Sequence, residues 1–143
     1  NETLRDRVCA VSDKTHYNEM NVLSMHALIG AYQPQGYEWV DELNQVLAGN
    51  IEYFCDYVDE HFEGVSYSRP QGTYMVFLDC TEWCREHGRD IQWLLDEGAR
   101  VGVGYQDGRP FHGPCHIRVN LALPLSRVRE ACDRLDRYVF NAR

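Results

Sequence analysis

Arg118 and Asn120 are the residues whose types and placement most directly suggest ligand binding. They lie in segment 116–124, where apolar Ile117 and Val119 alternate with them. Alternation with a period of two predicts a strand that has one face on a core and the arginine and amide on the opposite face. An arginine keeps its charge, and its planar guanidinium suits a carboxylate held by two parallel hydrogen bonds. On pattern alone, a solvent-facing arginine or an ion pair with one of the 22 acidic residues is the simpler interpretation.

Cysteines and histidines form a second group of candidates for chemistry: Cys80, Cys84, His87, Cys115 and His116. The first three have a Cys-x3-Cys-x2-His spacing, which is not a usual zinc pattern, and adjacent strand residues 115 and 116 point to opposite faces. We therefore expect no metal site, and we interpret the cysteines as small buried apolar residues. A Cys115 nucleophile with His87, His112 or His116 as its base is an open alternative that no spacing supports.

Length and composition narrow the class of protein. A chain of 143 residues has the size of one domain with its own core. Its formal net charge of −8, with 14 basic residues of which only Lys14 is a lysine, argues against nucleic acid and anionic membrane as partners. No apolar run has the length of a membrane span and no signal peptide is visible. Six cysteines without a compact disulfide pattern favour a cytoplasmic location.

The helices that must support the 116–124 strand are predicted from apolar spacing. Steps of three and four residues predict helices over residues 18–32, 40–62, 91–97 and 128–139, and a short helical lead opens the chain at residues 1–5. Gly49-Asn50 weakens the second of these and suggests a kink. We expect Asp90 and Ser126 to be N-caps and Gly98 to be a C-cap.

The strands are predicted over residues 65–68, 73–79, 101–103 and 116–122, with a glycine-rich loop over residues 102–113. Segment 73–79 has apolar residues at both parities, which is typical of a strand covered on both faces. Helices and short strands in this order predict an α+β domain with two layers, in which helices cover a mostly antiparallel sheet.

Residues 70–79 read Pro-Gln-Gly-Thr-Tyr-Met-Val-Phe-Leu-Asp. They resemble the strand Pro-Glu-Gly-Thr-Tyr-Leu-x-Trp-Leu-Asp in the C-terminal small domain of class I/II aminotransferases, which are pyridoxal-phosphate (PLP) enzymes of fold type I. Residues 117–124 resemble its Leu-Arg-Leu-Asn-Leu-Ala-x-Pro motif. Residues 31–43 and the pair Gly49-Asn50 are similar to segments of the MalY/PatB cystathionine β-lyase branch, and residues 1–5 resemble a segment that follows the cofactor lysine.

The resemblance implies roles for the two candidate residues of the 116–124 strand. Arg118 corresponds to the arginine that binds the α-carboxylate of an amino-acid substrate, and Asn120 is expected to support it from behind. By the same resemblance the whole chain, residues 1–143, is a fragment of a longer enzyme, an aminotransferase or a carbon–sulfur β-lyase that acts on amino acids. The resemblance leaves open which of the two reactions the enzyme catalyses.

The resemblance also implies what this chain lacks. PLP enzymes use a Schiff-base lysine, and the alignment of residues 1–5 places that lysine before this chain, so Lys14 is not expected to take its role. We therefore expect no catalytic and no cofactor-binding residue here, PLP in the full-length enzyme only, and a fragment that is inactive alone. Expected partners are the substrate, a missing N-terminal PLP-binding domain and, for the full-length enzyme, a second copy in a homodimer. A free-standing module that binds small carboxylates through Arg118 is the alternative function.

Overall fold

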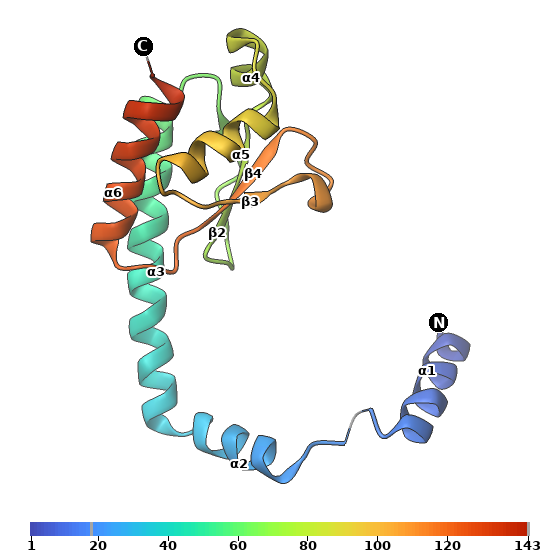
Figure 1. Ribbon diagram of the computed structural model, residues 1–143. Coiled ribbons are helices and arrows are strands. Elements are labelled where there is room, and N and C mark those ends of the chain that lie inside the picture. Colours follow the sequence, from blue (N-terminus) through green and yellow to red (C-terminus); the bar gives the residue numbers. More distant parts are fainter. Residues whose placement is uncertain (18, 143) are drawn as a thin grey trace. The chain divides into compact units, whose positions relative to one another are not determined.

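The computed structural model describes residues 1–17 and 19–142, and the chain divides into two compact units, Asn1–Glu42 and Leu43–Arg143. Figure 1 shows both, and each is described here by itself. One helix, α3 (Pro34–His61), contributes residues to both units.

The first unit consists of helices. Helix α1 (Glu2–Thr15) begins where the Asn1 side chain accepts a hydrogen bond from the Leu4 amide at 3.2 Å, and it is longer than the expected lead. Helix α2 (Val22–Ala31) has Asn21 as its N-cap and begins later than expected, and residue 18 lies outside the described residues. Among the described residues of this unit, only the Ser12 side chain is buried.

Helix α3 runs without interruption through Gly49-Asn50, so the suggested kink there is wrong. It also begins before the apolar stripe that predicts a helix from residue 40, because Pro34 is its first residue. Proline is well suited to the first turn of a helix, because its fixed φ is helical and its missing N–H would have no partner there.

The second unit is built on a four-stranded antiparallel sheet in the order β1-β2-β4-β3. The strands are β1 (Ser66–Tyr67), β2 (Met75–Asp79), β3 (Gln106–Asp107) and β4 (His116–Asn120). The prediction of a strand at 101–103 is wrong, because that segment is a turn and the edge strand forms at residues 106–107, inside the expected loop.

The core lies on one face of this sheet. Val76 and Leu78 of β2 and Ile117 and Val119 of β4 are buried, whereas the alternate residues of both strands are half-buried or exposed. The expectation that residues 73–79 are covered on both faces is therefore wrong. The alternation predicted for segment 116–124 is confirmed, and helices on the covered face complete an α+β domain with two layers.

Three helices form the second layer with α3. They are α4 (Thr81–His87), α5 (Ile91–Arg100) and α6 (Leu125–Leu135), and α6 continues into a π-helical turn, Asp136–Phe140. Helix α6 lies beside α3 (Figure 1), and the Tyr57 hydroxyl of α3 is 3.1 Å from the Asp136 carboxylate at the end of α6. The Trp83 indole donates a hydrogen bond to the Phe140 carbonyl at 3.2 Å, stacks on His87 and lies 5.7 Å from the Trp93 ring.

The caps of these helices are only partly as expected. Asp90 caps α5 by accepting a hydrogen bond from the Trp93 amide at 2.8 Å, as predicted. Gly98 is not the C-cap but a buried residue inside α5. Ser126 lies within the first turn of α6, which begins after Pro124 without a side-chain cap.

Candidate functional site

Arg118 lies in the middle of β4, directly opposite Phe77 on one side and Gln106 on the other. These side chains share the face of the sheet that the helices leave uncovered, since their neighbours Ile117 and Val119 are the ones buried in the core. The arginine is half-buried on this face. The fold therefore places it in the position that the sequence predicts, on the side away from the core.

A short loop holds an aromatic ring against the guanidinium. Phe111 ends a 3-10 turn, Arg109–Phe111, and the Arg118 Cζ lies 4.2 Å from the centroid of its ring. Gly113 lets the loop approach the sheet closely, because a Cβ there would lie 2.5 Å from the Phe77 ring. A cation above an aromatic face is favourable by about 0.5–2 kcal/mol, and stacking leaves the N–H edge of the guanidinium open.

The guanidinium of Arg118 has no acidic partner within the part of the chain that the structure describes. The ion pairs of residues 1–17 and 19–142 all involve other groups, and no side-chain hydrogen bond there involves Arg118. A half-buried guanidinium without an ion-pair partner is able to bind a carboxylate from outside this part of the chain.

Asn120 shapes the turn after β4. It is exposed, and its side-chain oxygen accepts a hydrogen bond from the Ala122 amide at 2.8 Å. It shares the open face with Arg118, two residues away along the strand. The direct action of its side chain is thus on the backbone that follows the strand.

Asn50 is a residue of the site that sequence reasoning missed. It is 1% exposed, and its side-chain NH₂ donates to the carbonyls of both Leu121 and Leu123 at 2.8 Å. Helix α3 is thereby joined to the segment in which β4 ends. The signal was present in the sequence, because Asn50 falls on the apolar stripe between Leu47 and Phe54, where a polar residue needs a buried partner.

The other end of the open face carries an imidazole–carboxylate pair. His116 Nε2 lies 3.8 Å from an Asp79 carboxylate oxygen, and the His116 ring is 4.6 Å from that of Phe77. Burial acts to raise the pKa of Asp79, but hydrogen bonds from the Thr81 hydroxyl and amide and the nearby His116 outweigh it and lower the pKa. Asp79 is therefore a carboxylate at neutral pH, and it orders the start of α4.

Cys80 and Cys84 are buried in the core, as expected of small apolar residues. Burial raises the pKa of Cys84 to about 12 and that of Cys80 still further, the opposite of what a nucleophilic thiol requires. His87 stacks on Trp83 and hydrogen-bonds its carbonyl at 2.9 Å. Over residues 1–17 and 19–142, no group of three or more His, Cys, Asp or Glu side chains is arranged to hold a metal ion. In the same residues no helix is long and apolar enough to span a membrane.

Curated proteins similar to this chain include two from mycobacteria. No family model matches the chain. A Mycobacterium leprae protein described as "Putative cystathionine beta-lyase" is 35% identical over 124 residues, which are 76% of this chain and 30% of that protein. Its namesake in Mycobacterium tuberculosis H37Rv is 32% identical over 128 residues, with the same shares.

Solved structures have the same fold. A PLP-bound C-S lyase of Staphylococcus hominis superposes with a TM-score of 0.74 at 22% identity, over 87% of this chain and 33% of that one. A mutant aspartate aminotransferase of Thermus thermophilus gives a TM-score of 0.75 at 17% identity, over 91% of this chain and 35% of that one. The chain is thus similar in sequence to proteins described as cystathionine β-lyases, and it shares its fold with PLP-bound C-S lyases and with aminotransferases. It spans about 30% of the length of the curated relatives it matches.

PLP is bound in solved structures that share this fold, and the residues described here do not make a site for it. The only lysine of the chain, Lys14, is exposed in the last turn of α1, and no hydrogen bond or ion pair of the described residues involves it. A Schiff-base lysine needs a pocket that lowers its pKa and a support for the cofactor ring. Within the described residues, Lys14 has neither of these surroundings.

Proposed function

We propose that residues 1–143 are the C-terminal small domain of a PLP-dependent aminotransferase or carbon–sulfur β-lyase that acts on amino acids. The similarity to cystathionine β-lyases over about 30% of their length and the two-layer α+β fold support this proposal. We expect the fragment alone to be inactive, because the described residues place the one lysine, Lys14, in an exposed helical turn. In this function the domain supplies substrate binding, and the remainder of the polypeptide supplies the chemistry.

Arg118 is the residue that binds the α-carboxylate of the substrate. The observation that carries this assignment is its guanidinium, which is half-buried on the open face and has no ion-pair partner in residues 1–17 and 19–142. Two parallel N–H···O bonds to a carboxylate contribute about 1.5–3 kcal/mol each and fix the orientation of the amino acid. That orientation determines which substrate bond faces the reacting centre.

Phe111 and Asn50 act on the substrate through Arg118. The Phe111 ring covers one face of the guanidinium, which restricts the arginine to a plane and excludes water from that face. Asn50 fixes the chain at Leu121, three residues after Arg118, and so holds the position of the strand. Asn120 supports the same strand end through its bond to the Ala122 amide. A guanidinium group that is held in one plane binds a planar carboxylate with little loss of side-chain entropy.

The remainder of the polypeptide is the proposed partner of the first unit. Helices α1 and α2 expose large apolar side chains such as Leu4, Val8 and Leu23, which are 62%, 60% and 82% exposed. Exposed apolar patches of this kind are typical of surfaces that another domain or subunit covers. We infer that the N-terminal PLP-binding domain, together with the second copy in a homodimer, covers these helices.

The test of the proposed function uses the full-length protein and substitutes Arg118. Arg118→Ala should lower kcat/KM for an amino-acid substrate such as L-cystathionine or L-aspartate by about 100-fold or more, mainly through KM, because two charge-assisted bonds are lost. Arg118→Lys should recover only part of this, since an ammonium cannot make the bidentate contact.

Arg129→Ala is the matched control for charge, because Arg129 lies on α6, with its guanidinium over Tyr53 and away from the open face. The expected kinetic constants are those of the unsubstituted enzyme. A full-length Arg118→Ala protein with unchanged KM for every amino acid tested contradicts the assignment, and an enzyme that never shows the absorbance of bound PLP contradicts the proposed function itself.

A further inference from the structure

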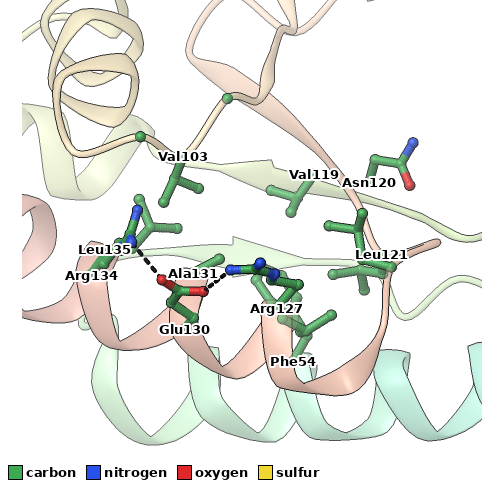
Figure 2. Close-up of a pocket in the computed structure, with 14 residues that line it drawn as sticks. Phe54, Val103, Val119, Asn120, Leu121, Arg127, Glu130, Ala131, Arg134 and Leu135 are labelled. Carbon is green, nitrogen blue, oxygen red and sulfur yellow. Dashed lines mark hydrogen bonds and ion pairs between the residues drawn. The ribbon is translucent and has the colours of Figure 1, made fainter.

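A cavity of about 360 Å³ lies on the core side of β4, the side opposite Arg118. Figure 2 shows it between the sheet and α6. Its walls are apolar side chains from α3, β4 and α6 and from the segment after α5, among them Phe54, Val103, Val119, Leu121, Val128, Ala131 and Leu135. A volume of this size with mostly apolar walls is within the range of small-molecule sites.

Hydrogen bonds from Arg134 hold two walls of the cavity together. Its Nη1 donates to the Val101 carbonyl at 3.1 Å, and its Nη2 donates to a Glu130 carboxylate oxygen at 2.5 Å. Gly102 permits this contact, because its φ is +76° and a Cβ there would lie 3.0 Å from Arg134 Nη1. The segment 101–104 is thus fastened to α6, and the cavity between them is preformed.

The polar side of the cavity carries an excess of positive charge. Arg127 and Arg134 share a single carboxylate, that of Glu130, to which Arg127 Nη1 donates at 2.8 Å. Hydrogen bonding from Arg127 and the charge of Arg134 lower the pKa of Glu130, so all three groups are ionised at neutral pH. The Arg127 side chain is 68% exposed and uses one of its N–H groups in this pair, which leaves the others for an incoming anion.

We propose that this cavity binds a free aliphatic monocarboxylic acid of medium length, about eight to twelve carbons, with its chain among the apolar walls and its carboxylate on Arg127. The walls favour a hydrocarbon chain because most of them are branched aliphatic side chains. The net positive charge disfavours a cation and gives a carboxylate an advantage over a neutral alcohol. Asn120 lies at the border of this cavity, but Arg118 does not line it, and the proposal does not depend on the proposed function.

The experiment titrates the full-length protein with decanoate and, as a neutral ligand of equal length, with decanol, by isothermal titration calorimetry. Arg127→Ala should weaken decanoate binding about tenfold and leave decanol unchanged, because one charge-assisted contact is lost. Ala131→Leu, a substitution that suits a helix and fills the cavity, should weaken both ligands about tenfold or more. Arg129→Ala, on the same helix but outside the cavity, and Arg118→Ala, on the other face of β4, should change neither.

Each contrary result overturns the proposal. Equal affinity for decanoate and decanol removes the role of Arg127, and decanoate binding that survives both Arg127→Ala and Ala131→Leu places the ligand elsewhere. No binding of millimolar decanoate, judged by calorimetry at two temperatures so that an enthalpy near zero is not mistaken for an absence of binding, contradicts the proposal. Because Arg127 is exposed, its variant tests the site even where Ala131→Leu fails to fold.

Discussion

The first 42 residues and the rest of the chain both form helices rich in apolar side chains, but only the second region buries them. Leu78 and Ile117, in the sheet, are fully buried, whereas Leu23 of α2 is 82% exposed. Good local helix signals such as the Asn1 and Asn21 caps are present in the first region without a core beneath them. Local sequence signals therefore determine where helices form, while the sheet determines which helices become part of a stable domain.

The largest contrast in stability between the two regions is expected from a matched pair of Leu→Ala substitutions. Leu78→Ala leaves a cavity in the core and should lower the free energy of unfolding of the chain by about 2–5 kcal/mol. Leu23→Ala should change it by less than about 0.5 kcal/mol, because that side chain is already in solvent. Urea unfolding followed by circular dichroism measures both, and equal effects would show that the two regions share one core.

The second largest effect is expected at Asn50, the polar residue on the apolar stripe of α3. Asn50→Leu leaves the buried carbonyl of Leu121 and the partly buried carbonyl of Leu123 without the Asn50 donor and should cost about 2–3 kcal/mol. Asn44→Leu is the control on the same helix, since Asn44 is exposed. If the two leucine variants unfold at the same urea concentration, the hydrogen bonds from Asn50 to the segment after β4 do not contribute to the free energy of unfolding.

A smaller effect, with a defined pH dependence, is expected at Asp79. Its pKa is lowered in the folded protein, so the stabilisation is present above the usual carboxylate pKa and is lost as the pH falls through the folded value. Asp79→Ala should therefore destabilise by about 1 kcal/mol near neutral pH, where the carboxylate caps α4 through Thr81, and by much less near pH 3.

Urea midpoints at the two pH values test this prediction. Glu86→Ala, an exposed position on α4, is the matched control and should be near neutral at both. A difference between Asp79→Ala and the parent chain that is the same at both pH values would mean that Asp79 acts by packing and not by charge.

The smallest effect on stability is expected in the first region, where a charge should be tolerated. Val8→Glu on α1 should leave the urea midpoint unchanged within about 0.5 kcal/mol and should lower the light scattering of the 143-residue chain, because an exposed apolar patch is interrupted. A loss of more than about 1 kcal/mol would show that this patch is covered within the chain itself, and the contrast between the regions would then fail.

Much of the fold was predictable because its signals are local. The alternation around Arg118 correctly predicted the strand and its open face, and Asp90 correctly predicted the start of α5. The strand at 101–103 was wrong because alternating Val101 and Val103 pack against the core from a turn, and pairing with β4 occurs only further along the chain, at residues 106–107. Edge pairing is a long-range property, so a two-residue strand such as β3 leaves little trace in its own sequence.

The candidate site likewise contains one residue that the sequence could predict and others that it could not. Arg118 could be found from strand alternation and from the family resemblance, because both are read along the chain. Phe111 and Asn50 could not be found in this way, because each contacts groups that only the fold brings close. The Phe111 ring is placed against the Arg118 guanidinium by a loop. Asn50 donates hydrogen bonds to carbonyls that are 71 and 73 residues away along the chain. A polar residue on an apolar helical stripe is the one sequence signal that could have indicated Asn50 in advance.

The aromatic stack at Trp83 gives the molecule its own optical reporter. Trp83 is 2% exposed, whereas Trp39 in the first region is 62% exposed. Iodide should therefore quench the red-shifted emission of Trp39 and leave the blue-shifted emission of Trp83 largely intact. The fluorescence spectrum of the unlabelled chain should thus distinguish the covering of the first region by a partner from the unfolding of the second.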